Sequence, residues 1–412
     1  MPEPHLPADF DFTNPELLTQ GPPRSHYAEM RRVAPVWWNA QPHNIAGFDD
    51  DGYWVVTRHA DVMAVSRDSE TFSSWENTAI VRYYPEMTRE RIEMQRTVLL
   101  NMDPPHHTKL RAIVSRGFTP RAINALRSAL SARAETIVRG ALSGGTGDFV
   151  TDVACELPLQ AIAELLGIPS EDRRKIFDWS NAMIGYDDPE YDTDPLMPAM
   201  ELMAYAMTMA EQRQIEPADD IVTKLVDVEV DGEHLSFDEF GFFVILLAVA
   251  GNETTRNAIS HGMLAFLNHP DQWELFKRER PKSAVDEIVR WATPVNVFQR
   301  TATRDTVLGG QSIKAGQRVG IFYGSANFDE EVFTDPERFD VLRTPNPHLG
   351  FGGSGPHYCL GAWLARLELR ILLEEMLKRS LRLVPAGEPV RTRSNFVNGL
   401  QELPVRAVSN AG

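Results

Sequence analysis

Apolar residues recur every three to four positions along most of the chain, which is the period of an amphipathic α-helix. The clearest case begins at Ser236, where Ser236 and Glu239 have the spacing of a capping box before a long apolar run. We expect this helix to continue to about Leu267 and to lie inside the protein, because it is apolar on all sides for several turns. Similar spacing predicts further helices over Pro120 to Gly140, Leu157 to Leu166, Ala199 to Gln214, Asp219 to Val228 and Ala362 to Lys378.

Two stretches are rich in β-forming residues instead. Tyr53 to Thr57 predicts one strand, and Ser312 to Ile321 predicts two short strands around a Lys-Ala-Gly turn. The expected fold is therefore mainly α with small β-sheets. Because no repeat, low-complexity linker or shift in composition divides the chain, we expect residues 1–412 to form a single domain.

Composition narrows the class of protein. With 412 residues and 43% apolar content the chain can bury a large core. Its two cysteines imply no disulfide framework, so we expect a cytoplasmic protein. A net charge of −17 argues against nucleic acid as a partner. The acidic, proline-rich start is unlike a secretory signal, and the apolar run Phe240 to Ala250 is too short to span a bilayer, so no membrane anchor is expected.

One cysteine, Cys359, lies in a glycine-rich loop directly before the predicted helix Ala362 to Lys378. Glycines such as Gly361 let the main chain approach a sulfur closely enough to donate N–H groups to it, and the helix start adds positive potential. This pattern suits a thiolate that binds a metal. Taken alone, however, the pattern favours a buried structural cysteine, which is what most single cysteines are.

The predicted central helix carries an acid and an alcohol, Glu253 and Thr254, where an apolar residue is expected. Ala250 and Gly251 precede them, and their missing side-chain volume would leave room for a small molecule against the helix. An acid–alcohol pair beside such a gap is typical of a proton relay. The alternative is that the threonine bonds to its own helix and Glu253 reaches solvent or an arginine.

Two further groups of charged residues are candidates for defined roles. Glu287 and Arg290 lie three positions apart on a predicted helix and could form an ion-pair triad with Arg338, although many such pairs are exposed and contribute little. His107 and Arg111 are one helical turn apart and could hold the carboxylates of an anionic cofactor, or simply form a solvated face. Arg300 and His357 would be additional donors.

Four motifs, in order, give the chain a family resemblance. They are the run Ala250 to Thr255, the Glu287/Arg290 pair, the segment Pro336 to Phe339, and the loop Gly355 to Gly361 with Cys359. With these motifs the chain resembles the cytochrome P450 monooxygenases over essentially its whole length. In this family a cysteine thiolate binds haem iron. One departure is that the usual phenylalanine seven residues before the cysteine is replaced by Gly352, with Phe351 one residue further away.

The resemblance is closest to the actinobacterial steroid C26-monooxygenases, in the stretches Leu100 to Thr108, Phe240 to Asn257, Asp286 to Arg300 and Ser325 to Phe333. It implies haem b bound through Cys359, hydroxylation of the terminal side-chain methyl of cholesterol or cholest-4-en-3-one with O₂, and Thr254 and Glu253 as the oxygen-activating pair. Haem contacts are expected from His107, Arg111, Gly251, Arg300, Phe351, His357 and Gly361. The alternatives left open are a hydroxylase of branched fatty acids or terpenoids, a peroxygenase and a non-catalytic haem protein.

Attack on a terminal methyl, rather than on the weaker tertiary C–H beside it, requires a narrow channel. The expected walls of this channel are Ile80, Phe242, Leu246, Val249, Val295, Val297, Phe298 and Phe396. The sequence has no nucleotide-binding turn and no cysteine set for an iron–sulfur cluster, so we expect no fused reductase. Electrons should then come from a ferredoxin and its reductase. Lys109, Arg111 and Arg116 mark the expected docking area.

Overall fold

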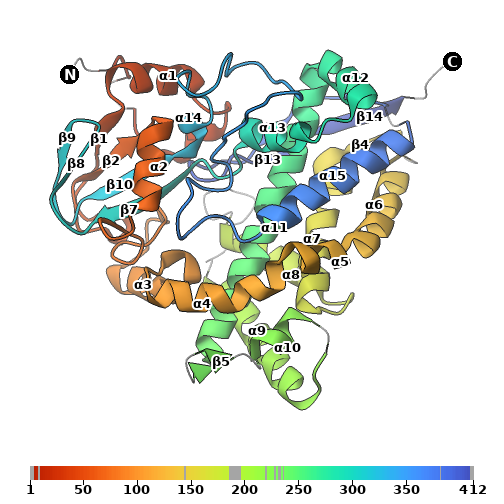
Figure 1. Cartoon of the computed structure of the whole chain (residues 1–412), viewed down its shortest axis with the longest axis horizontal. Coiled ribbons are helices and arrows are strands. Elements are labelled where there is room, and N and C mark those ends of the chain that lie inside the picture. The colour runs from red at the N-terminus through yellow and green to blue at the C-terminus, as the bar shows by residue number, and fades with distance from the viewer. Residues whose placement is uncertain are drawn as a thin grey trace.

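The computed structural model describes residues 4–7, 10–142, 145–184, 196–218, 220–226, 229–230, 233–234, 236–380 and 382–408. Helices form most of this part, and Figure 1 shows α11 running through the middle of them. The helices are α1 (Arg24–Val33), α2 (His59–Arg67), α3 (Arg89–Met94), α4 (His106–Ser115), α5 (Pro120–Ala125), α6 (Arg127–Leu142), α7 (Glu156–Leu166), α8 (Arg173–Ile184), α9 (Leu196–Ile215), α10 (Ile221–Val226), α11 (Phe237–Asn268), α12 (Pro270–Glu279), α13 (Ser283–Ala292), α14 (Tyr323–Ala326) and α15 (Ala362–Lys378).

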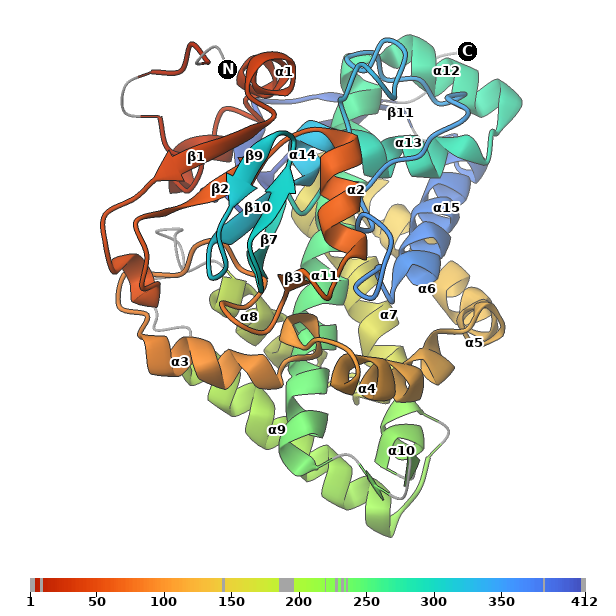
Figure 2. The ribbon, with the colours of Figure 1, turned by 60° about the vertical axis from the view of Figure 1, so that its left-hand side comes forward.

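A five-stranded sheet lies beside the helical part, as Figure 2 shows. Its order is β1-β2-β10-β7-β3, with β2 and β10 parallel and the other neighbours antiparallel. The strands of this sheet are β1 (Val36–Ala40), β2 (Gly52–Val56), β3 (Phe72–Ser73), β7 (Val297–Ala302) and β10 (Arg318–Phe322). Shorter sheets contain β4 (Thr146–Asp148), β5 (Glu229–Val230), β6 (Glu233–His234), β8 (Thr306–Leu308), β9 (Gln311–Ile313), β11 (Arg382–Pro385), β12 (Val390–Arg391), β13 (Leu400–Glu402) and β14 (Pro404–Val408).

The central helix forms as its sequence predicts. The Ser236 hydroxyl accepts the Glu239 N–H at 3.1 Å, and the Glu239 carboxylate accepts the Ser236 N–H at 2.9 Å, which completes the capping box. Helices α7, α8, α9 and α13 pack against α11, so its apolar sides are covered. No helix in the described part of the chain is both long and apolar enough to cross a membrane.

The other predicted elements are present, with three differences. The stretch predicted as one helix from Pro120 is divided at Leu126 into α5 and α6. The two strands around the Lys-Ala-Gly turn do not pair with each other, because β9 pairs with β8 while β10 pairs with β2 and β7. The predicted helix at 219–228 is α10, and Asp219, Asp227 and Val228 lie outside the described residues.

Candidate active site

A cavity of about 1440 Å³, counting its open mouth, lies between α11, α4, β7 and the loop that leads into α15. Apolar side chains make up most of its wall. The few polar side chains in this wall are therefore the candidates for catalysis and for binding the polar groups of a ligand.

The cysteine loop presents Cys359 to this cavity. The side chain is exposed there, while protein atoms enclose the sulfur on its other sides. Burial raises the pKa of the Cys359 thiol, and the backbone N–H groups of Gly361 and Ala362, which donate to the sulfur, act in the opposite direction together with Arg111 and Arg366. The expected arrangement of main-chain donors and a helix start around one sulfur is thus present in the structure.

The shape of this loop explains why a glycine replaces the usual phenylalanine. Gly352 has φ of +98°, a conformation that a phenylalanine would adopt only with strain. A Cβ at Gly355 would stand 2.3 Å from the Ser66 carbonyl oxygen, so only glycine fits there. Phe351 lines the cavity and its carbonyl accepts the Cys359 N–H at 2.8 Å. The displaced phenylalanine therefore stays part of the cysteine loop.

At the polar end of the cavity four side chains converge from three segments. His107 and Arg111 come from α4, Arg300 from β7 and His357 from the cysteine loop, and the two imidazole rings lie 4.3 Å apart. Neither nitrogen of the buried His107 ring has a hydrogen-bond partner. Burial lowers the pKa of His107 to about 4, with Arg111 and Arg300 adding to the effect, and burial lowers the pKa of His357 well below its ordinary value.

These four side chains fit a dianionic group. Arg111 donates to the Tyr358 carbonyl oxygen and Arg300 to the Gln299 carbonyl oxygen at 2.6 Å, yet neither pairs with a carboxylate among the described residues. Buried cations and an unpartnered buried imidazole are unfavourable unless an anion joins them. The two carboxylates of haem would supply that anion, and Cys359 would hold the haem iron.

The face of α11 that lines the cavity is rotated by about one residue from the face predicted. Phe243, Leu246, Leu247, Ala250 and Thr254 line the cavity, whereas Phe242 and Val249 do not. Counting back from Thr254 by four, seven and eleven residues gives Ala250, Leu247 and Phe243 and would have found this face.

Gly251 and Ala250 both line the cavity, and Gly251 also has a role in packing. A Cβ at Gly251 would stand 2.3 Å from the Cδ1 atom of Ile162 on α7. The glycine therefore also permits close packing of α11 on α7.

The acid and the alcohol on α11 have different surroundings. The Thr254 hydroxyl faces the cavity and donates to the Ala250 carbonyl oxygen at 2.6 Å. Glu253 is buried and does not line the cavity; its carboxylate pairs with Arg256 and accepts the Asn257 amide at 2.9 Å. The bonds that the alternative interpretation described are thus formed, with Thr254 bonded to its own helix and Glu253 paired with an arginine.

Among the other predicted channel residues, Val295 and Phe298 line the cavity. The prediction that Val297 lines the channel was wrong. Successive side chains of a strand point to opposite sides, so Val297 lies on the other side of β7, where it packs with Phe12 and Tyr27. Ile80 packs beside Phe48 and Tyr83, and the ring of Phe396 lies 5.5 Å from the ring of Phe298. Neither Ile80 nor Phe396 is among the residues that line the cavity. Sequence reasoning missed the wall residues Leu99, Leu100, Phe118, Ile162 and Leu364. Ile162 and Leu364 lie on predicted helices, but the helical period does not show which side of these helices meets the cavity.

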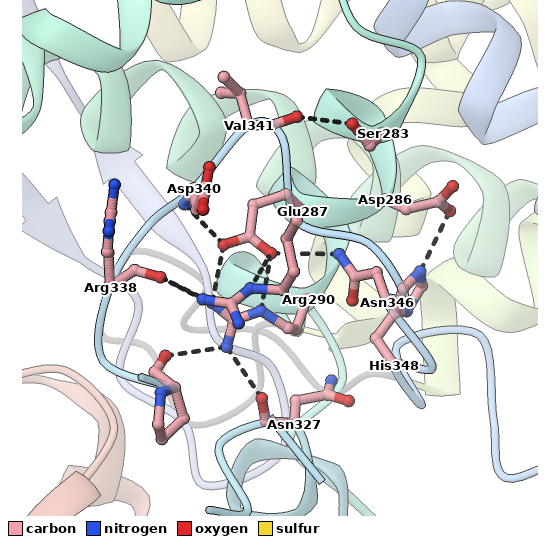
Figure 3. Close-up of polar contacts among 12 residues, drawn as sticks. Ser283, Asp286, Glu287, Arg290, Asn327, Arg338, Asp340, Val341, Asn346 and His348 are labelled. Atoms are coloured by element: carbon pink, nitrogen blue, oxygen red, sulfur yellow. Dashed lines mark hydrogen bonds and ion pairs between the residues drawn. The ribbon is translucent and has the colours of Figure 1, made fainter. Parts of the chain in front are cut away.

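The ion-pair triad is present, but its third member is Arg343 instead of Arg338. Figure 3 shows the Glu287–Arg290 pair at its centre. Arg290 donates twice to the fully buried Glu287 carboxylate, each time at 2.8 Å, and Arg343 Nε donates to it at 3.1 Å. Arg338 contributes only its carbonyl oxygen, which accepts from Arg290 Nη2 at 3.2 Å, while its side chain is exposed. The cluster fixes α13 to the segment that precedes the cysteine loop.

A mainly helical fold that encloses a large cavity, with one cysteine sulfur held by main-chain N–H groups and a cationic end for two carboxylates, defines a haem-thiolate protein. The comparisons with known proteins agree. The cytochrome P450 family description matches residues 282–404. The steroid C26-monooxygenase of Rhodococcus jostii (strain RHA1) is 61% identical over 403 residues, which cover 98% of this chain and 86% of that protein. The chain belongs to the cytochrome P450 family, whose cofactor is haem, and it is a P450 monooxygenase.

Two further relatives show how specific the similarity is. The methyl-branched lipid omega-hydroxylase of Mycobacterium tuberculosis (strain ATCC 25618 / H37Rv) is 42% identical over 392 residues, or 92% of this chain and 90% of that protein. The structure of Mycobacterium marinum cytochrome P450 CYP268A2 in complex with pseudoionone has a TM-score of 0.86 at 40% identity, covering 93% of this chain and 94% of that one. The predicted fold class is confirmed.

Proposed function

We propose that this protein hydroxylates the terminal side-chain methyl (C26/C27) of cholesterol or cholest-4-en-3-one. The observation that carries the proposal is the 61% identity, over 98% of the chain, to a relative named steroid C26-monooxygenase. The long, mostly apolar cavity supports it, because a sterol side chain offers only apolar surface to such a wall.

In this proposal each polar residue of the cavity has one role. Cys359 would bind the iron as a thiolate, and the N–H groups of Gly361 and Ala362 favour this anionic form against the effect of burial. His107, Arg111, Arg300 and His357 hold the haem carboxylates. When bound, the haem supplies the activation of O₂.

Proton delivery falls to the acid and the alcohol of α11. Thr254 would turn its hydroxyl from the Ala250 carbonyl toward oxygen in the cavity. Glu253 would bring protons to Thr254 after releasing Arg256 and Asn257, because its carboxylate is engaged by both. Glu253 would therefore carry protons only after its contacts with Arg256 and Asn257 have broken.

Electrons are proposed to come from a ferredoxin and its reductase. A ferredoxin is acidic, so it needs a local basic area on a protein whose net charge is −17. Lys109 on α4 and Arg116 directly after α4 have exposed side chains, whereas Arg111 is half-buried and directed to the cavity wall. The proposed docking area therefore consists of Lys109 and Arg116, without Arg111.

Spectral titration of the purified holoenzyme tests the substrate. Cholest-4-en-3-one should displace the iron-bound water and shift the spin state at lower concentration than a methyl-branched or straight fatty acid does. Turnover with ferredoxin, reductase and NADH should then give the terminal alcohol or acid. Tighter binding and faster turnover of methyl-branched lipids would favour the second candidate, which the 42% identity to the omega-hydroxylase supports.

A further inference from the structure

One charged side chain beside the cysteine loop has no part in the function described so far. Arg366 lies on α15, and its guanidinium carbon stands 4.4 Å from the centre of the Phe351 ring. The carbonyl oxygen of Phe351 accepts the Cys359 N–H at 2.8 Å. Phe351 thus contacts Arg366 with its ring and Cys359 with its backbone, and the fold fixes a positive charge near the residue that carries the sulfur.

The position of Arg366 differs from that of two other cations around the site. Arg111 and Arg300 line the cavity, where they can reach the carboxylates of a cofactor, whereas Arg366 does not line it. Burial raises the pKa of the Cys359 thiol, and the charge of Arg366 acts against this rise. Arg366 therefore acts on the site through the cysteine rather than through a cofactor carboxylate.

Asp286 of α13 holds Arg366 in this place. Arg366 Nε donates to Asp286 Oδ1 at 2.8 Å, and the same oxygen contacts His348 Nε2 at 3.1 Å, a contact that Figure 3 shows. Because His348 Nδ1 accepts the Gly350 N–H at 3.2 Å, the imidazole proton is on Nε2, which donates to Asp286. His348 is thus a neutral donor, and the charges of this group belong to Arg366 and Asp286.

Both members of the Arg366–Asp286 pair are ionised. Burial acts to raise the pKa of Asp286, but the hydrogen bond from His348 and the charge of Arg366 bring it below its ordinary value. Burial acts to lower the pKa of Arg366, but Asp286 and Tyr358 bring it above its ordinary value. The Arg366 and Asp286 side chains are 26% and 33% exposed, so solvent screens the pair only in part. The positive member of the pair lies over the Phe351 ring.

We propose that Arg366 raises the reduction potential of the haem iron through Cys359, and that Asp286 limits this rise by offsetting the Arg366 charge. The inference rests on Cys359 as the iron ligand, which is part of the function proposed above. A positive charge near the iron ligand favours the state with one more electron, and a negative charge disfavours it. No bond forms or breaks at either side chain, and the ferredoxin supplies the electron. Arg366 is therefore a positioning residue that makes the first electron easier to accept.

Redox titration of the purified holoenzyme, followed by its haem absorbance, tests the proposal by the sign of two shifts. Arg366→Gln removes the positive charge, so the ratio of reduced to oxidised iron at a fixed potential should fall at least about twofold, or about 18 mV for one electron. Asp286→Asn removes the negative charge, so the same ratio should rise. Both variants break the same ion pair, so a purely structural role would move both potentials in the same direction.

Three control variants separate charge from packing. Arg366→Lys keeps the charge without the planar group over the Phe351 ring, so its potential should lie closer to the wild type than that of Arg366→Gln. Arg370 lies one turn further from Cys359, about 6 Å along α15, so Arg370→Gln should shift the potential less than Arg366→Gln does. The double variant Arg366→Gln/Asp286→Asn loses both charges and should return toward the wild type.

Three results would overturn the proposal: a shift below twofold in Arg366→Gln, a potential of Asp286→Asn that is not above the wild type, or a shift in Arg370→Gln as large as that in Arg366→Gln. If Arg366→Gln does not retain haem, the sign of the Asp286→Asn shift decides alone.

The iron ligand and the substrate are tested separately. The red-shifted Soret band of the reduced carbon monoxide complex reports the thiolate, so its absence from the wild type would reject Cys359 as the ligand and the proposal with it. Reduction potentials are measured without a substrate, so failure of the sterol assay would reject the proposed substrate and leave the test of Arg366 intact.

Discussion

Replacing Glu287 by glutamine is expected to destabilise the protein strongly. The Glu287 carboxylate accepts two hydrogen bonds from Arg290, one from Arg343 at 3.1 Å, one from the Asp340 N–H at 2.9 Å and one from Asn346 at 3.1 Å. The side chains of Glu287 and Arg290 are both 0% exposed. Glutamine would remove the charge and turn an N–H₂ group toward donors, which leaves the Arg290 guanidinium buried without a counter-ion.

Breaking a buried pair from one side typically costs about 3–5 kcal/mol. This corresponds to a factor of roughly 150 to 5000 in the unfolding equilibrium. The matched control is Glu274→Gln, since Glu274 and Lys277 have the same spacing but are exposed, and such pairs contribute less than about 1 kcal/mol. The loss in free energy of unfolding should therefore be clearly larger for Glu287→Gln than for Glu274→Gln.

Urea unfolding of the holoenzyme, followed by far-ultraviolet circular dichroism and by haem absorbance, measures the effect. Glu287→Gln combined with Arg290→Met should recover much of the loss, because the uncompensated charge is then removed. Arg343→Gln should destabilise more than Arg338→Gln, whose side chain is exposed. A stability of Glu287→Gln within about 1 kcal/mol of the Glu274→Gln control would refute this account of the cluster.

Three further variants test other parts of the site. Thr254→Ala removes the hydroxyl that faces the cavity and should lower product per NADH by about tenfold or more, whereas unchanged coupling would reject its role in proton delivery. Gly251→Ala places a Cβ against Ile162 and should lower the free energy of unfolding by about 1–3 kcal/mol, with partial recovery on adding Ile162→Val; no loss in urea unfolding would contradict the packing argument. Phe243→Ala should change the ratio of terminal to subterminal hydroxylation of a sterol while Phe242→Ala should not, and gas chromatography of products would show equal effects if the cavity face were misassigned.

The sequence was sufficient for those parts of the fold that depend on local pattern. The helix Ala362–Lys378 has the bounds that its period predicts, and the cap at Ser236 forms as expected. The cysteine loop was predicted from chemistry, since the sulfur needs main-chain donors and a helix start. These features are encoded by residues that are neighbours in the chain.

Apart from the wrong choice of the cavity face of α11, the errors lie where the structure depends on residues far apart in the chain. Arg343 replaces Arg338 in the ion-pair cluster because the fold of the segment from Asp335 turns the Arg338 side chain outward, which spacing alone does not reveal. Val297 and Phe298 are both apolar, and only the packing of β7 decides which of the two faces the cavity. Gly251 packs against Ile162 of another helix, and the sequence pattern of α11 alone does not reveal this contact.

The cationic end of the cavity has a consequence for how the protein matures. His107, Arg111, Arg300 and His357 come from parts of the chain that are far apart, so this end exists only when those parts have come together in the folded protein. The positive charges brought together there repel one another. Haem, which is anionic and binds only the folded form, therefore shifts the folding equilibrium toward that form by mass action. The amount of active enzyme that a cell accumulates should therefore follow its supply of porphyrin iron as closely as its supply of messenger RNA.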